Sequence, residues 1–359
     1  MTKDGDFKQI VRARMTKTGE SYTTARGRLR ATTDTVLHLT NGDSAARTLR
    51  ASGITGVVLP WRDVLHTGPV PAVPAARLRR IRAGYLASLG VTGEPEALAF
   101  LTERDRTLHR HRGTYLLWFE ADLYDQLQLI QILAMLHDYA VDPERITLIC
   151  IGEYPGIGHF GGLGELSADQ LVGLRDIGAP LSPAAIELAR RAWAALRASN
   201  PHAYTDIART ISGELRFVSE AFDRLGREFP STRDGLSLTE RRLLATLTDT
   251  DLTAGDAFVQ AAAREIRPFL GDTTCFHLLA ELATGSHPLV NLDRGRNPDQ
   301  ARTWQVGLTN DGRRVLNGDA DRPTLIGMDR WIGGVHLTGD TPDWRWDEGS
   351  ETLVHHPRT

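Results

Sequence analysis

The sequence predicts an α/β protein: a Rossmann-like parallel-sheet domain, then a helical connector and a winged-helix-like C-terminal domain. Short apolar runs, most of them followed by a polar turn and a helical segment, predict the sheet at residues 36–39, 54–59, 115–119 and 146–151. Beyond residue 231, three helical segments precede two short strands, which is the winged-helix order. The 359 residues are enough for two cores. We therefore divide the chain into a basic arm (1–33), an α/β domain (34–175), a connector (176–230) and a winged-helix-like domain (231–359).

Composition and charge exclude several classes of protein. The chain is 41% hydrophobic and 24% charged, as soluble globular proteins are, and its formal charge of -3 predicts no general affinity for nucleic acid or membranes. No apolar stretch could span a bilayer and no signal peptide precedes the fold, so we expect a cytoplasmic protein. Cys150 and Cys275 each lie in an apolar context, which predicts buried, reduced thiols rather than a zinc site.

The N-terminal arm is rich in basic residues, namely Lys3, Lys8, Arg12, Arg14, Lys17, Arg26, Arg28 and Arg30. One interpretation is an arm that contacts phosphate groups. The other is a solvated helical appendage that packs on the domain or on a partner subunit, which leaves a homo-oligomer open. We favour the appendage, because apolar residues such as Ile10, Val11 and Met15 need a surface to pack on.

The first strand is followed by a tight turn and a helix at residues 45–51. The N-terminus of a helix in such a βα unit binds anions, so Asn41, Gly42, Asp43 and Ser44 are candidate ligand-binding residues. Asp43 would repel an anion unless it held a sugar hydroxyl or a metal ion. The turn is neither a dinucleotide-binding GxGxxG motif nor a Walker A loop.

The second strand leads into a proline-bounded loop at residues 60–69. Trp61, Asp63 and His66 are side chains that can bind ligands or take part in catalysis, and a simple connection between elements does not need them. We expect Asp63 and His66 to lie near Asp43. His66 could act as an acid or base near neutral pH. The alternative is that Asp63 and His66 brace each other and the backbone.

Three carboxylates gather where the strand at 115–119 meets the next helix. Asp122 fits an N-cap and Asp125 the first helical turn, so for these two a structural role is an open alternative. Capping does not require Glu120. Ligands bind at the carboxyl ends of strands in open α/β sheets, and we expect the carboxylates there to face solvent.

A glycine-rich loop at residues 152–164 follows the strand at 146–151. Ordering such a loop costs conformational entropy, which a ligand or a moving lid would explain. Glu153 and His159 are its candidate inward-facing groups. The alternative is a surface Ω-loop.

Four blocks stand out across these segments and the C-terminus: HLTNGDSAARTLR, VLPWRDVLHTGPVP, LLWFEADLYDQLQLIQIL, and DRWIGGVHL with WRWD. Together they resemble the bacterial family catalogued as domain of unknown function 1835, from about Val36 to the C-terminus. The resemblance implies that the four blocks form one site, and it carries over no catalytic residues.

The C-terminal domain offers little for reading DNA. Its third helix, predicted at 273–282, has no lysine or arginine, so we do not expect nucleic-acid binding from it. The segment 329–337 and the tryptophans Trp344 and Trp346 predict a ribbon that folds back on the α/β domain, where Arg330 or His336 would add positive charge to the acidic crevice. The alternative is a hydrophobic cluster within the C-terminal domain.

Two functions remain. The first is a hydrolase or group-transfer enzyme for a small phosphorylated or nucleotide-like substrate, with Asp63, His66, Glu120 and Asp122 as catalytic candidates and Mg²⁺ as a candidate cofactor. The second is a ligand-sensing regulator that contacts nucleic acid or protein through the basic arm or the winged helix.

Overall fold

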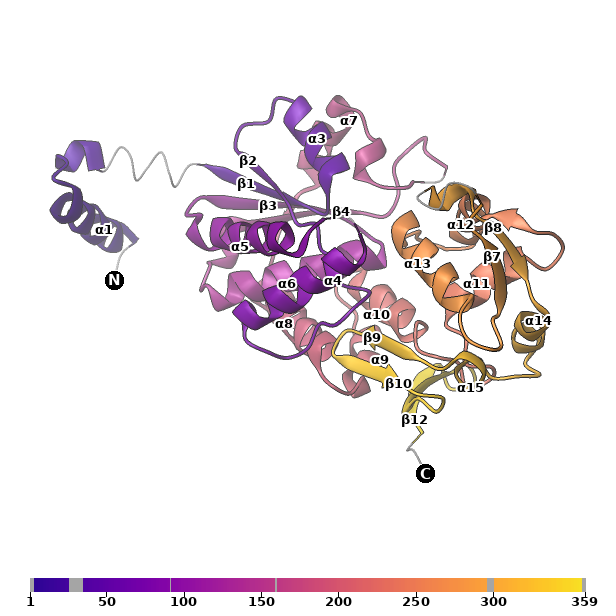
Figure 1. The fold of residues 1–359 in the computed structure, drawn as a ribbon. Helices are drawn as coiled ribbons and strands as arrows, with labels where there is room; N and C mark the ends of the chain where they lie inside the picture. Colours follow the sequence, from indigo (N-terminus) through magenta and orange to yellow (C-terminus); the bar gives the residue numbers. More distant parts are fainter. Residues whose placement is uncertain (1–2, 26–34, 91, 159, 296–299, 357–359) are drawn as a thin grey trace.

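A mixed five-stranded sheet organises the N-terminal part of the molecule (Figure 1). The computed structural model describes residues 3–25, 35–90, 92–158, 160–295 and 300–356. The strand order is β2-β1-β3-β4-β5. Four strands are parallel and the fifth is antiparallel to its neighbour: β1 (Val36–Thr40), β2 (Val57–Pro60), β3 (Thr114–Glu120), β4 (Ile146–Ile151) and β5 (Ala179–Pro180). The carboxyl ends of β1, β3 and β4 therefore share one edge, and the predicted α/β class is confirmed.

Helices cover both faces of the sheet (Figure 1). On one face, α3 (Asp43–Ala51) and α7 (Ala168–Gly173) share a core with Trp118 and Ile149. The other face packs against the largest core, to which α6 (Leu123–Asp138) contributes most of its side chains. The helices α4 (Ala75–Ser88) and α5 (Glu94–Arg110) lie on this second side.

The helices predicted as a connector belong to that same core. They are α8 (Pro183–Arg197), α9 (His202–Ala208) and α10 (Val218–Gly226). Trp193, Tyr204 and Phe222 from these helices are buried together with residues of α6 and the sheet. The segment 183–226 is therefore a structural layer of the α/β unit.

A second core forms within residues 236–326. Its helices are α11 (Leu238–Thr246), α12 (Ala254–Ala262), α13 (Asp272–Leu282), α14 (Asn310–Asn317) and α15 (Arg322–Ile326). Its antiparallel sheet has the order β6-β8-β7, from β6 (Leu252–Thr253), β7 (Val290–Asp293) and β8 (Gln305–Leu308).

The C-terminal ribbons return to the first core. They are the pairs β9 (Asp329–Ile332) with β10 (Val335–Thr338), and β11 (Trp344–Asp347) with β12 (Thr352–His355). Within the segment 329–337 the chain reverses at Gly333, whose φ is 58°, so this segment forms two short strands. The ribbons pack on the first core, as predicted, because Val70 donates its backbone N–H to the Gly333 carbonyl and Trp344 and Trp346 are buried there. The β9–β10 turn lies at the end of α8, however, and does not close the crevice at the carboxylates.

The described part of the N-terminal arm is mainly the helix α1 (Lys3–Thr18). Val11 on this helix and Ala25 after it are fully buried. Arg26, Arg28 and Arg30 of the predicted basic arm lie outside the described residues. Within the described ranges, no helix is both long and apolar enough to cross a membrane.

Candidate functional site

Three carboxylates meet at the carboxyl end of β3. Glu120 is the last residue of the strand, Asp122 caps α6 by accepting the backbone N–H of Asp125 at 3.1 Å, and Asp125 lies in the first helical turn. One carboxylate oxygen from each residue lies within 4.8 Å of the other two. The capping role predicted for Asp122 is confirmed. The same side chain also belongs to the carboxylate cluster.

The cluster is oriented by hydrogen bonds from neighbouring strands. The side-chain amide of Asn41, just beyond β1, donates to Asp125 at 2.7 Å and to Glu120 at 3.4 Å. Asp125 also accepts the backbone N–H of Glu120 at 2.6 Å. Asp125 is therefore a positioning residue, which leaves Glu120 and Asp122 as the carboxylates available to a ligand.

The glycine-rich loop folds over these carboxylates. The backbone N–H of Leu163 donates to the Glu120 carboxylate at 2.7 Å. Gly162 has a φ of 135°, and a Cβ there would overlap the same carboxylate, so only glycine suits this position. Gly164 packs in the same way against Ser44 and covers the start of α3.

The surroundings of the three carboxyl groups disfavour their ionised forms. Burial, followed by the charge of Asp122, raises the pKa of Glu120. Burial likewise raises the pKa of Asp122 and of Asp125. Within the described residues, no lysine, arginine or histidine forms an ion pair with any of the three. Ionised carboxylates this close repel each other, so a proton or a bound cation must offset the charge.

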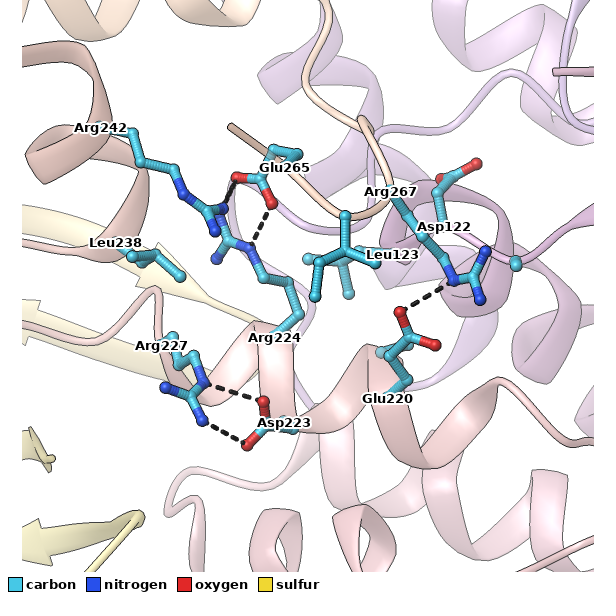
Figure 2. A pocket seen from close by; sticks show the side chains of 13 residues that line it. Asp122, Leu123, Glu220, Asp223, Arg224, Arg227, Leu238, Arg242, Glu265 and Arg267 are labelled. Carbon is cyan, nitrogen blue, oxygen red and sulfur yellow. Dashed lines mark hydrogen bonds and ion pairs between the residues drawn. The ribbon is translucent and has the colours of Figure 1, made fainter. Parts of the chain in front are cut away.

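Two hollows adjoin the cluster. A hollow of about 20 Å³ touches Glu120 and Asp122 and is also lined by Phe160, Gly161 and Pro268. This volume suits one water molecule or one small ion, not a substrate. A larger cavity of about 320 Å³ lies next to it between α6, α10 and α11 (Figure 2). The two spaces share four lining residues, namely Ala121, Asp122, Ile266 and Arg267.

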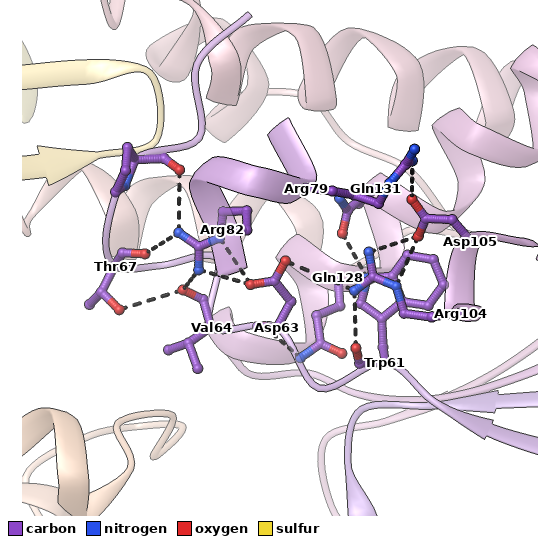
Figure 3. Close-up of polar contacts among 11 residues, drawn as sticks. Trp61, Asp63, Val64, Thr67, Arg79, Arg82, Arg104, Asp105, Gln128 and Gln131 are labelled. Carbon is purple, nitrogen blue, oxygen red and sulfur yellow. Dashed lines mark hydrogen bonds and ion pairs between the residues drawn. The ribbon is translucent and has the colours of Figure 1, made fainter. Parts of the chain in front are cut away.

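Asp63 lies in a different place from the one expected. Instead of facing solvent near Asp43, its side chain is only 1% exposed and is held by Arg82 at 2.8 Å, with Arg104 at 3.9 Å (Figure 3). Trp61 is also buried, donates its indole N–H to Gln131 at 2.7 Å, and is covered by the Arg104 guanidinium. These are core interactions, so neither residue is part of the carboxylate site.

His66 is buried as well and lines neither hollow. Its ring packs edge-on against Phe269 and Tyr124, with centroid distances of 5.1 and 5.9 Å. Within the described residues neither ring nitrogen has a hydrogen-bond partner, and burial lowers the pKa of His66 to about 3. The acid–base role expected for His66 beside Asp43 therefore has no support in this geometry.

The first βα turn contributes Asn41 to the site but not its other residues. Asp43 is exposed and forms an ion pair with Arg62, and Gly42 occupies the N-cap of α3. Glu153, expected to point inward, is exposed. His159 lies outside the described residues.

Arg330 and His336 do not supply positive charge to the carboxylate cluster. Arg330 donates to Glu240 at 2.7 Å and to Glu281 at 3.1 Å, both in the second unit. His336 bonds to Asp329 at 2.6 Å and stacks on Trp331. The ribbon that carries them docks elsewhere, against the carbonyls at the end of α8.

Sequence reasoning missed the basic residues of the larger cavity: Arg224, Arg227, Arg242 and Arg267. They come from α10, α11 and the segment after α12, far along the chain from β3. No spacing pattern links these segments, so no signal in the sequence could have placed them beside Asp122.

Comparison with known proteins adds no family. Neither the family models nor the curated proteins contain a match. Among solved structures, a similar chain is the DNA-binding, cleavage and re-ligation domain of Plasmodium falciparum topoisomerase II, at 13% identity and a TM-score of 0.44. The match covers 90% of this chain and 55% of that one. A likeness at this TM-score carries no functional argument.

Proposed function

We propose that this protein is an enzyme of the hydrolase or group-transfer type that acts on a small phosphorylated or nucleotide-like substrate. In this proposal Glu120 and Asp122 hold a divalent cation such as Mg²⁺ at the carboxyl end of β3. The observation that supports it most is the trio of buried carboxylates with oxygens within 4.8 Å and without a basic partner in the described residues. Hard divalent cations prefer such carboxylate oxygens.

The surroundings of the trio support a cation rather than a structural ion pair. The Asn41 amide and the backbone N–H of Leu163 donate to the Glu120 carboxylate and orient it, as groups around a metal ligand do. The 20 Å³ hollow beside Glu120 and Asp122 has room for one small ion. A bound cation would polarise a phosphoryl oxygen of the substrate or activate a water molecule.

The finer fold assignments belong to the same proposal. The parallel strands β1 to β4 with helices on both faces support a Rossmann-like unit, whose ligand site is expected at this sheet edge. The order α11-β6-α12-α13-β7-β8, with the sheet order β6-β8-β7, supports a winged-helix-like unit. The family resemblance, the cytoplasmic location and a homo-oligomer stay predictions.

The alternative function, a ligand-sensing regulator, has one supporting observation in that winged-helix-like order. Its recognition element is poor, because α13 reads DTTCFHLLAEL and carries no lysine or arginine. Nucleic-acid binding needs cations against phosphate. A regulator would therefore contact another protein, or use the basic arm.

The test is cation binding by isothermal titration with Mn²⁺ and Mg²⁺. We expect the wild-type protein to bind and Glu120→Gln to lose binding, because glutamine keeps the shape but not the charge. Asp43→Asn is the matched control, since Asp43 lies at the same sheet edge and pairs with Arg62 outside the cluster. Equal binding by wild type and Glu120→Gln, or no binding by wild type, would contradict the proposal. A panel of phosphate esters then tests turnover.

A further inference from the structure

We propose that the cavity of about 320 Å³ beside Asp122 is the subsite for the phosphate group of the ligand, and that a cation on the carboxylates strengthens anion binding there. This inference rests on the proposed function for the cation, but the anion subsite has its own evidence. Four arginines line the cavity (Figure 2): Arg224, Arg227, Arg242 and Arg267. Guanidinium groups bind phosphate through paired N–H donors.

One of the four arginines is fully engaged by the protein. Arg224 donates to Glu265 at 2.7 and 3.0 Å, to Glu228, and to the Thr239 hydroxyl. Its guanidinium also stacks on Phe269 at 4.8 Å. Arg224 is therefore a scaffold residue that fixes Glu265 at the cavity wall.

The other three arginines keep unused donors. Arg242 meets Glu265 through Nη1 alone, so its Nε and Nη2 have no hydrogen bond within the described residues (Figure 2). Arg267 donates from Nε to Glu220 and from Nη1 to the Gly152 carbonyl, which leaves Nη2. Arg227 donates from Nε and Nη2 to Asp223 and from Nη2 to Glu351 as well, which leaves Nη1. Donors not used by the protein are what an anion requires.

The four acids that line the cavity have different partners. Glu220, Asp223 and Glu265 each pair with an arginine of the cavity, whereas Asp122 belongs to the carboxylate cluster. Four arginines and four acids line the cavity, and Glu228 and Glu351 just outside it also pair with Arg224 and Arg227, so the lining has no excess positive charge without a cation. A cation on Glu120 and Asp122 would offset the negative charge of Asp122, the lining acid that has no arginine partner among the described residues, and would make the cavity more favourable for an anion.

The offset of the Asp122 charge by a cation predicts coupling between the two sites. A cation makes the cavity attractive to an anion, and by linkage the anion strengthens cation binding by the same factor. Asp122 and Arg267 are the charged residues that line both hollows, so they lie between the two sites.

The size of the cavity limits the ligand. A volume of about 320 Å³ lies at the lower end of small-molecule pockets, which span roughly 300–1,000 Å³. Ile266, 85% exposed on the rim shared by both hollows, offers an apolar contact for the part of the ligand that bears the phosphate. The ligand class is a small phosphate ester rather than a polymer.

The experiment is a titration with inorganic phosphate at constant ionic strength, with MgCl₂ and with EDTA. We expect Mg²⁺ to tighten phosphate binding by about fivefold or more, as allosteric couplings typically do. Arg242→Gln and Arg267→Gln should each weaken it about tenfold, the loss of one charged hydrogen bond. Arg190→Gln is the matched control and should bind as wild type does, because Arg190 lies exposed on α8 and, among the described residues, forms an ion pair with Glu187 alone.

Thermal denaturation of each variant verifies folding, and Glu265 keeps Arg224 when Arg242 is replaced. Phosphate affinity unchanged in both arginine variants, or absent from the wild type with Mg²⁺, would overturn the subsite. Phosphate binding in EDTA that depends on Arg242, without any Mn²⁺ binding, would support the subsite while the proposed cation site fails. Mn²⁺ binding without phosphate binding would support the cation site and contradict the phosphate subsite.

Discussion

At the scale of single residues, two buried acids that follow strands of the same sheet have opposite environments. Asp63 is compensated by Arg82 and Arg104, whereas Glu120 has, in the part of the chain that the structure describes, neutral donors and other carboxylates around it. Compensated charge stabilises a fold, and uncompensated charge calls for a ligand or a proton. A buried acid near the end of a strand therefore stabilises the fold at Asp63 and belongs to a candidate site at Glu120.

Asp63→Ala should lower the free energy of unfolding by about 3–5 kcal/mol, because it leaves the buried Arg82 without its carboxylate. Asp43→Ala should cost less than about 1 kcal/mol, since its ion pair with Arg62 is exposed. Urea denaturation of both variants measures the difference. A small loss for Asp63→Ala would mean that Arg82 finds another partner.

At the scale of elements, the β9–β10 turn attaches the C-terminal ribbon to the α/β unit. Gly334 donates its N–H to the Leu196 carbonyl at 2.8 Å, and a Cβ on Gly334 would overlap the Arg197 carbonyl. The contact is backbone against backbone, which only glycine allows. The ribbon is thus held at the end of α8, away from the carboxylates.

Gly334→Ala should destabilise the protein by about 1–3 kcal/mol, because rigid backbone must move to admit the methyl group. Mn²⁺ binding at Glu120 should be unchanged. Gly213→Ala is the control, since a Cβ at Gly213 meets nothing within 4 Å. Thermal denaturation and cation titration measure the two effects, and equal melting temperatures for both variants would refute the close contact.

At the scale of the whole molecule, the chain forms two hydrophobic cores. Residues 236–326 form the second core, and the C-terminal ribbons after them pack in the first. A buried ion network joins the two parts. Glu240 of α11 accepts from Arg322 at 3.1 Å and from Arg330 of β9 at 2.7 Å. Burial alone would raise the pKa of Glu240, but the charges of Arg330 and Arg322 outweigh it and lower this pKa to about 2.

Because this pKa lies below the ordinary 4.5 of glutamate, the ionised Glu240 stabilises the fold above about pH 4.5, and that stability is lost as the pH falls toward 2. Glu240→Gln should cost about 3 kcal/mol or more at neutral pH, because the buried Arg322 loses its charged partner. Urea denaturation across this range should show the gap between the variant and wild type closing in acid. A gap independent of pH would contradict the assignment.

The sequence by itself determined the class of fold and the central part of the site. Hydrophobic periodicity is a local property, so the strands around Leu39, Leu117 and Ile149 and the long helix after Asp122 are predictable from it. The carboxylates Glu120 and Asp122 were predictable too, because a strand that runs into a capped helix puts its next residues at the sheet edge. Asn41 followed from the same rule applied to β1.

Only the tertiary structure decided which other polar residues join that site. Asp63, His66 and Trp61 also follow a strand, yet their loop turns into the helical layer, where Arg82, Phe269 and Gln131 surround them. Arg242 and Arg267 reach Asp122 from the second unit, more than a hundred residues along the chain. Local patterns record which face of a strand or helix is buried. They do not record which distant charge compensates a buried acid, because that depends on how whole units dock.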